Sequence, residues 1–145
     1  MKLYGLTKVE LEGKIFVIIS GGRTFSSHTT GLVSSYSVTE NEWLDLPDLN
    51  LERESHSACC LGSTLFVFGG HDGQSIMNSV EILKLATADE ILPWALLQSE
   101  GSFEPRQSCL VCPIDDHSIL LAGGFDSDII FADAYIFDIQ SHTWS

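Results

Sequence analysis

The apolar residues of this chain fall in short runs separated by polar turns, the pattern of β-strands rather than of helices. In the first third, it predicts strands over residues 9–11, 15–20, 32–38 and 42–46. Turn-forming residues separate these runs, as in segments 12–14 and 39–41. The same alternation continues to the C-terminal end, so the sequence predicts a nearly all-β chain with little or no helix.

Three of the apolar runs end in a glycine doublet. The doublets are Gly21-Gly22, Gly69-Gly70 and Gly123-Gly124. The runs before them are apolar at consecutive positions, which is typical of strands buried on both faces. Glycine at the end of such a strand permits positive φ angles and lets neighbouring backbones approach closely.

Three tryptophans follow the doublets in phase. Trp43, Trp94 and Trp144 are 51 and 50 residues apart, and a period of about 50 residues indicates a repeat architecture. Tyr36 and Phe137 each stand seven residues before the next Trp. The second copy has a Leu at this aromatic position and an insertion, 86–90, which favours a helical turn. We expect these tryptophans, Trp43 included, to pack between repeats.

An Arg precedes two of the doublets, as Arg53-Glu-Ser-His56 and Arg106-Gln-Ser-Cys109. This order of Arg-x-x-His, Gly-Gly, aromatic residue and Trp resembles the kelch repeat, and the resemblance covers nearly the whole chain. The first copy departs from it with Gly5 and Lys8 in place of Arg and His, and the third has Cys in place of His. The matching residues are Gly21, Gly22, Tyr36, Trp43, Arg53, His56, Gly69, Gly70, Trp94, Arg106, Gly123, Gly124, Phe137 and Trp144.

The resemblance implies a kelch-type β-propeller of about three four-stranded blades. Blade 1 is expected at about 3–49, blade 2 at about 53–98 and blade 3 at about 106–145, where it is truncated. Propellers typically have about 4–8 blades, so the ring is expected to be incomplete. We therefore expect an open apolar flank at each end, and self-association through open blade edges.

Composition narrows the partners. The net charge is −13, with only 7 Lys and Arg. This argues against nucleic acid, whose binding depends on a basic patch, and against an anionic membrane surface. No signal peptide or apolar run long enough to cross a membrane is recognisable. The four cysteines are not spaced as a disulfide framework, which favours a reduced, cytoplasmic location.

Residues that carry chemistry are few. Cys109 and Cys112 have the spacing of a zinc knuckle, but on a strand two residues three apart point to opposite faces. Buried structural cysteines are therefore the favoured interpretation. The acidic pairs 115–116 and 126–128 are explained by turns, and the five histidines are scattered. The sequence predicts no metal, no cofactor and no catalytic set.

The loops remain as candidate binding elements. In kelch relatives, the loop after the doublet and the loop before the Arg strand share the face that takes the partner. In this chain the first set is 23–31, 71–78 and 125–133, and the second is 48–52 and 101–105. The candidate partner-binding residues are Arg23, Phe25, His71, Ile76, Met77 and Phe125.

The roles of four of these large side chains stay open at this point. Phe25 and Phe125 either contact a partner or pack against a neighbouring blade, with neither role favoured. For Arg53 and Arg106 a structural role, bonding between blades, is favoured over binding.

The resemblance implies a non-enzymatic module that binds a protein or peptide through loops on one propeller face. A scaffold, a substrate adaptor of a ubiquitin ligase and an actin-binding protein are versions of this function. The alternative is part of a kelch-propeller enzyme, an oxidase or a sugar-processing enzyme, whose active-site residues lie outside this chain.

Overall fold

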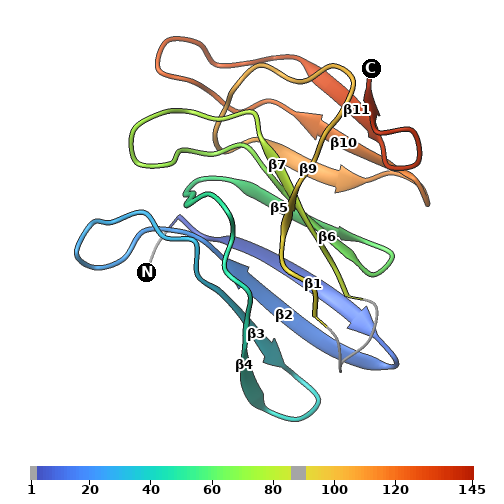
Figure 1. The fold of residues 1–145 in the computed structure, drawn as a ribbon. Coiled ribbons are helices and arrows are strands. Elements are labelled where there is room, and N and C mark those ends of the chain that lie inside the picture. Colours follow the sequence, from blue (N-terminus) through green and yellow to red (C-terminus); the bar gives the residue numbers. More distant parts are fainter. Residues whose placement is uncertain (1–2, 86–90) are drawn as a thin grey trace.

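Three antiparallel four-stranded sheets make up the fold in a computed structural model of the chain, which describes residues 3–85 and 91–145 (Figure 1). The first sheet contains β1 (Gly5–Leu11), β2 (Lys14–Ser20), β3 (Val33–Ser37) and β4 (Glu42–Leu46). The second contains β5 (Ser57–Leu61), β6 (Thr64–Phe68), β7 (Val80–Lys84) and β8 (Ala95–Leu96). The third contains β9 (Leu110–Pro113), β10 (Ser118–Ala122), β11 (Ala134–Asp138) and β12 (Thr143–Trp144).

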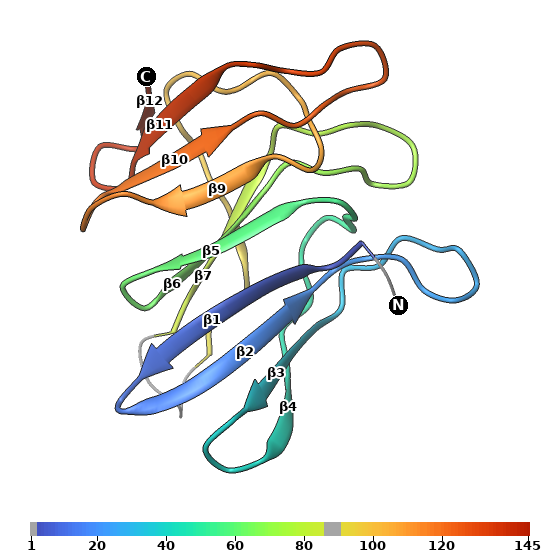
Figure 2. The ribbon, with the colours of Figure 1, turned by 180° about the vertical axis from the view of Figure 1, so that it is seen from behind.

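Within each sheet the strands pair in sequence order, so each sheet is an up-and-down blade. No helix occurs in the described residues, which confirms the predicted all-β fold with kelch-type blades. The helical turn expected at 86–90 lies outside the described residues. Figure 2 shows the first strands β1, β5 and β9 side by side, and β5 contacts both of the others.

The middle blade explains why strands before the doublets are apolar at every position. Leu65 and Val67 on β6 pack against Val9 and Ile18 of blade 1. Phe66 and Phe68, on the other face of the same strand, pack in the cluster that contains Ile119, Leu121 and Phe137 of blade 3. Successive side chains of a strand point to opposite faces, so a blade between two neighbours needs apolar residues at consecutive positions.

Two of the three tryptophans contact the preceding blade. Trp94 is 4% exposed, and its indole Nε1 donates a hydrogen bond to the Pro47 carbonyl at 2.9 Å. The Trp144 ring lies 6.1 Å from the Phe68 ring and 5.1 Å from the Phe103 ring, measured between centroids. Each Trp thus seals the rim between its own blade and the one before it.

The prediction that Trp43 packs between blades is wrong for the described chain. Trp43 is 61% exposed and stacks on Tyr36, its cross-strand partner, with ring centroids 5.1 Å apart. Its equivalents are buried by a preceding blade, and the described residues contain no blade before β1. The same sequence position therefore has different burial in different blades.

His56, the last residue of the Arg-x-x-His motif, fills the space between blades 1 and 2. Its Nε2 is hydrogen-bonded to the Ser20 hydroxyl at 2.9 Å, and the side chain is buried. A Cβ on Gly21 would lie 2.8 Å from the ring, and one on Gly70 would lie 2.8 Å from the His56 Cβ. The doublets thus make room for this ring. Burial, and then the charge of Arg53, lower the pKa of His56 to about 3.

We predict that His56→Cys, which copies Cys109 of blade 3, flattens the pH dependence of stability. Between pH 6.5 and about 3, the unfolded chain binds a proton at His56 that the folded chain does not. The free energy of unfolding should therefore fall with pH in this window by about 1.4 kcal/mol per pH unit. Urea denaturation under reducing conditions should show this slope in the parent and lose it in the variant.

The exposed His28 is the matched control, and His28→Cys should keep the parent slope. Equal slopes for His56→Cys and the parent would show that His56 is not held neutral by the fold.

We also predict that Trp94→Ala destabilises the chain far more than Trp43→Ala. Removing the buried indole of Trp94 should cost about 3–5 kcal/mol. Trp43 is mostly exposed, so its loss should cost much less. Guanidinium denaturation midpoints measure both, and similar midpoints would contradict the burial difference.

Candidate partner-binding site

The loops that follow the doublets project from the same side of the three blades, at left in Figure 1. Short bridges close them: Arg23 pairs with Thr29, His71 with Ile76, and Phe125 with Ile130. The segment that leads into each Arg strand lies beside the loop of its own blade, because Glu54 pairs with His71 and Gln107 with Phe125. Both sets of predicted loops therefore share one face.

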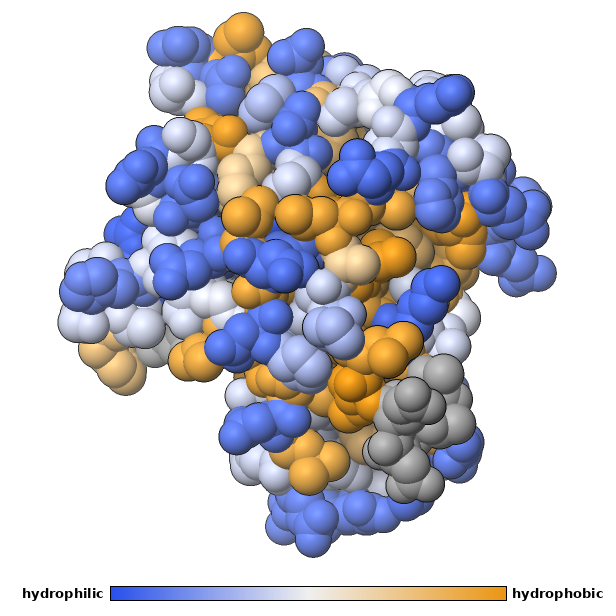
Figure 3. All heavy atoms as spheres, viewed as in Figure 1, coloured by the Kyte–Doolittle hydropathy of each residue, from blue (hydrophilic) through white to orange (hydrophobic). Residues whose placement is uncertain are grey.

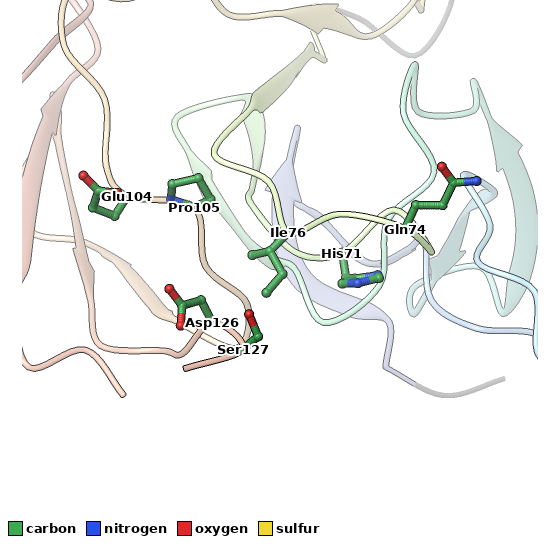
Figure 4. A pocket seen from close by; sticks show the side chains of 7 residues that line it. All are labelled: His71, Gln74, Ile76, Glu104, Pro105, Asp126 and Ser127. Carbon is green, nitrogen blue, oxygen red and sulfur yellow. The ribbon is translucent and has the colours of Figure 1, made fainter. Parts of the chain in front are cut away.

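A solvent-open pocket of about 410 Å³ lies between the loops of blades 2 and 3 (Figure 4). The blade 2 loop contributes His71, Gln74 and Ile76, the segment before β9 contributes Glu104 and Pro105, and the blade 3 loop contributes Asp126 and Ser127. We call these seven residues the interblade pocket. It combines two carboxylates with apolar surface from Ile76 and Pro105.

The carboxylate of Asp126 is held in place by its own loop. Its Oδ1 accepts hydrogen bonds from the backbone N–H groups of Asp128 and Ile129, both at 2.7 Å. These bonds lower the pKa of Asp126, so the group is anionic at neutral pH. Asp72 is fixed in the same way by the N–H groups of Gln74 and Ser75, which lower its pKa.

The arginines near this face are neutralised within the chain. Arg23 Nε donates to Glu54 Oε2 at 2.8 Å, and this hydrogen bond is the main cause of the lowered Glu54 pKa. Arg53 Nη2 donates to Glu81 Oε2 at 2.8 Å, and Arg106 Nη2 donates to Asp133 Oδ2 at 3.0 Å. Within the described part of the chain, the carboxylates of Glu104 and Asp126 have no such cationic partner, so the pocket keeps net negative charge.

Arg53 and Arg106 are fully buried, so neither side chain is available to a partner. Arg53 Nη1 donates to the carbonyls of Gly69 and Ser79, at 3.0 and 3.2 Å. Arg106 Nη1 donates to the Gly123 carbonyl at 2.9 Å, and its guanidinium lies over the Phe131 ring. These bonds run within one blade, which corrects the expectation of side-chain bonds between blades.

The predicted partner-binding residues separate into two groups. His71 and Ile76 line the interblade pocket, whereas Arg23, Phe25, Met77 and Phe125 do not. Phe25 is 98% exposed, so the interpretation that it packs against a neighbouring blade is wrong. Phe125 is 39% exposed.

Sequence reasoning did not single out Gln74, Glu104, Pro105, Asp126 or Ser127, although all lie in the predicted loops. Asp126 was interpreted as a turn residue, which it also is. The signal available was that loops of neighbouring blades converge.

The loop side is mostly hydrophilic in the view of Figure 3, and apolar residues gather toward the middle of that view. A second hollow, of about 160 Å³, is lined mainly by apolar residues, among them Phe16, Leu44 and Leu85. It also includes Ile91, next to the undescribed residues 86–90, so we assign it no partner.

The cysteines are free thiols. Burial raises the pKa of Cys59 to about 12 and also raises the pKa of Cys109. Cys112 is exposed, which corrects the expectation that all four are buried. In the described ranges, no three His, Cys, Asp or Glu side chains gather as metal ligands.

The family assignment follows from comparison with known proteins. The model of the KLHDC2/KLHL20/DRC7 Kelch-repeats domain matches residues 4–145. The chain belongs to the kelch-repeat family. In the described residues, no helix has the length and apolar character needed to span a bilayer.

Curated relatives agree with this assignment. Human Kelch domain-containing protein 3 is 29% identical over 92 residues, which cover 59% of this chain and 23% of the relative. Acyl-CoA-binding domain-containing protein 4 of Arabidopsis thaliana is 30% identical over 66% of this chain and 14% of its own length. Kelch-like protein 24a of Danio rerio is 36% identical over 46% of this chain and 10% of its own length. The chain thus spans about a quarter or less of these kelch relatives.

We predict that Arg53→Met destabilises the chain by about 3–5 kcal/mol, because it leaves Glu81 buried without its cation. Glu81, like Arg53, is fully buried, so water cannot solvate the remaining carboxylate. Lys84→Met is the control on the same blade. Lys84 is exposed, and its replacement should stay within about 0.5 kcal/mol. Equal urea midpoints for the two variants would contradict a structural role for Arg53.

Proposed function

We propose that this kelch-repeat chain is a non-catalytic interaction module that binds a basic protein or peptide segment at its loop face. The interblade pocket carries the proposal, since it joins the predicted loops of two blades and retains uncompensated carboxylates. The net charge of −13 adds long-range attraction for a basic partner. We place this binding in the cytoplasm, in line with the free cysteines.

The chemistry of the pocket suits an Arg or Lys side chain. Ile76 and Pro105 provide apolar surface for the aliphatic stem of such a residue. Glu104 and Asp126 provide carboxylates for its charged head, and a guanidinium can donate to both. His71 and Gln74 add groups that can accept hydrogen bonds at neutral pH.

The other predicted residues would extend this contact. Phe25 is almost fully exposed, and Arg23 and Phe125 are partly exposed, so they are available at the margin of a larger interface. An adaptor role in a ubiquitin ligase and a scaffold role on actin remain versions of this proposal. Both would use the same loop face.

We also propose that the chain self-associates. Apolar side chains stay exposed on the outer blades in the described residues, for example Leu6 at 59% and Leu110 at 65%. Contiguous exposed apolar surface of this kind often marks a protein interface.

The binding proposal predicts that the double variant Glu104→Gln/Asp126→Asn weakens capture of a basic peptide. The probe is a fluorescent, unstructured peptide with three Arg in a Gly-Ser background, and its Gln-substituted twin reports background binding. We expect the Kd to rise about tenfold, which corresponds to about 1.4 kcal/mol, and binding of the parent to weaken at high salt. Fluorescence anisotropy measures both effects.

The control Glu12→Gln/Asp116→Asn removes the same charge from the hairpin turns β1–β2 and β9–β10. It should bind the peptide like the parent. An equal loss of affinity in both double variants would mean that the net charge, and not the pocket, attracts the peptide, and would overturn the proposed site.

A further inference from the structure

The blades of this chain stack with a fixed polarity. In each blade one face points to the following blade, which we call the leading face, and the other is the trailing face. Val9 and Ile18 on the leading face of blade 1 meet Leu65, Val67 and Leu83 on the trailing face of blade 2. The leading face of blade 2 meets the trailing face of blade 3 in the same way, since Phe66 and Phe68 pack with Ile119, Leu121 and Phe137.

The trailing face of blade 1 is open. Strand pairing sets Leu6 beside Ile19, Val17 beside Tyr36, and Tyr36 beside Trp43. Leu6 is 59% and Trp43 61% exposed, and the other three are partly exposed. Tyr36 and Trp43 occupy the positions that Phe137 and Trp144 occupy on the trailing face of blade 3, where they pack against blade 2.

The leading face of blade 3 is the other open face. Pairing between β9, β10 and β11 puts six residues on it: Leu110, Cys112, Leu120, Ala122, Ala134 and Ile136. All are exposed or half-buried. Leu120 and Ala122 stand where Phe66 and Phe68 stand in blade 2, so this face corresponds to one that is buried inside the chain.

Charge is nearly absent from both open faces, although the chain carries −13. None of the six residues on the leading face of blade 3 is ionisable at neutral pH except the Cys112 thiol. On the trailing face of blade 1, Lys8 and Glu10 pair with each other at 3.0 Å. The excess negative charge therefore lies away from the two surfaces, so it does not oppose their contact.

We propose that two copies of this chain associate head-to-tail, the leading face of blade 3 of one copy packing on the trailing face of blade 1 of the other. One open face is of each kind, and inside the chain a leading face always meets a trailing face. A second copy would cover both pairs at once and supply six blades in total, within the usual propeller range of about 4–8. The contact uses sheet faces rather than strand edges. It rests on the proposed self-association and does not depend on peptide binding at the interblade pocket.

The test begins with the mass of the purified chain, measured by light scattering over a range of concentrations. A closed pair predicts a limiting mass of about 32 kDa, twice the 15.9 kDa of one chain. A mass of one chain at every concentration would overturn the proposal. So would a mass that keeps growing with concentration, because that is the behaviour of an open stack.

Two variants decide whether the contact joins unlike faces. Ile136→Glu alters the leading face of blade 3, and Trp43→Glu alters the trailing face of blade 1. Each alone should give monomers, because each removes one half of every interface. Mixing the two variants should restore a dimer, since the intact leading face of one meets the intact trailing face of the other. If only one variant gives monomers, or the mixture stays monomeric, like faces pair and the proposal fails.

Ile130→Glu is the matched control, since Ile130 is 87% exposed on a loop and should leave the dimer intact. Far-UV circular dichroism checks that all variants keep the β spectrum of the parent. The Arg peptide separates this inference from loop-face binding. Monomeric Ile136→Glu that binds the peptide like the parent confirms two independent surfaces, whereas loss of peptide binding on monomerisation would contradict their independence.

Discussion

Close backbone contact at the glycine doublets is the constraint on which the arrangement of the blades depends. The N–H of Gly22 donates to the Arg53 carbonyl at 2.8 Å, and the N–H of Gly70 donates to the Arg106 carbonyl at 2.9 Å. A Cβ on Gly21 would stand 2.3 Å from that same Arg53 oxygen. The distance between blades is therefore set where a side chain is missing. The loop face begins at the same doublets, so the width of the interblade pocket follows from this contact.

Most of the fold could be predicted from the sequence because its signals are local. Apolar runs, turn residues and the repeat period each report on a single blade, and the predicted strand 42–46 matches β4. Burial of a whole face is not local. Trp43 and Trp94 occupy equivalent positions, yet one is exposed and the other buried. The difference lies in whether a blade precedes them, which the residues around each Trp do not encode.

The candidate site was predictable only as a set of loops. The pairing of Arg23 with Glu54 joins residues 31 apart in the sequence, so the sequence offered Arg23 as a free cation when the fold neutralises it. Glu104 and Asp126 face one pocket from two separate segments. Their shared location depends on how blades 2 and 3 pack. Side-chain type identified the pocket residues His71 and Ile76, but only the fold places the carboxylates that give this pocket its charge.

The buried carboxylate of Glu81 has a consequence for how the chain unfolds. It accepts hydrogen bonds from the backbone N–H groups of Asn50 and Leu51, at 2.6 and 3.1 Å, so the middle blade holds the segment that leaves blade 1. The Asn50 side chain also donates to the Trp94 carbonyl at 2.8 Å. Opening the middle blade would strip these partners from its neighbour, so the coupling between adjacent repeats is strong. Amide protons of β6 should therefore exchange with solvent only through a cooperative opening that involves more than one blade.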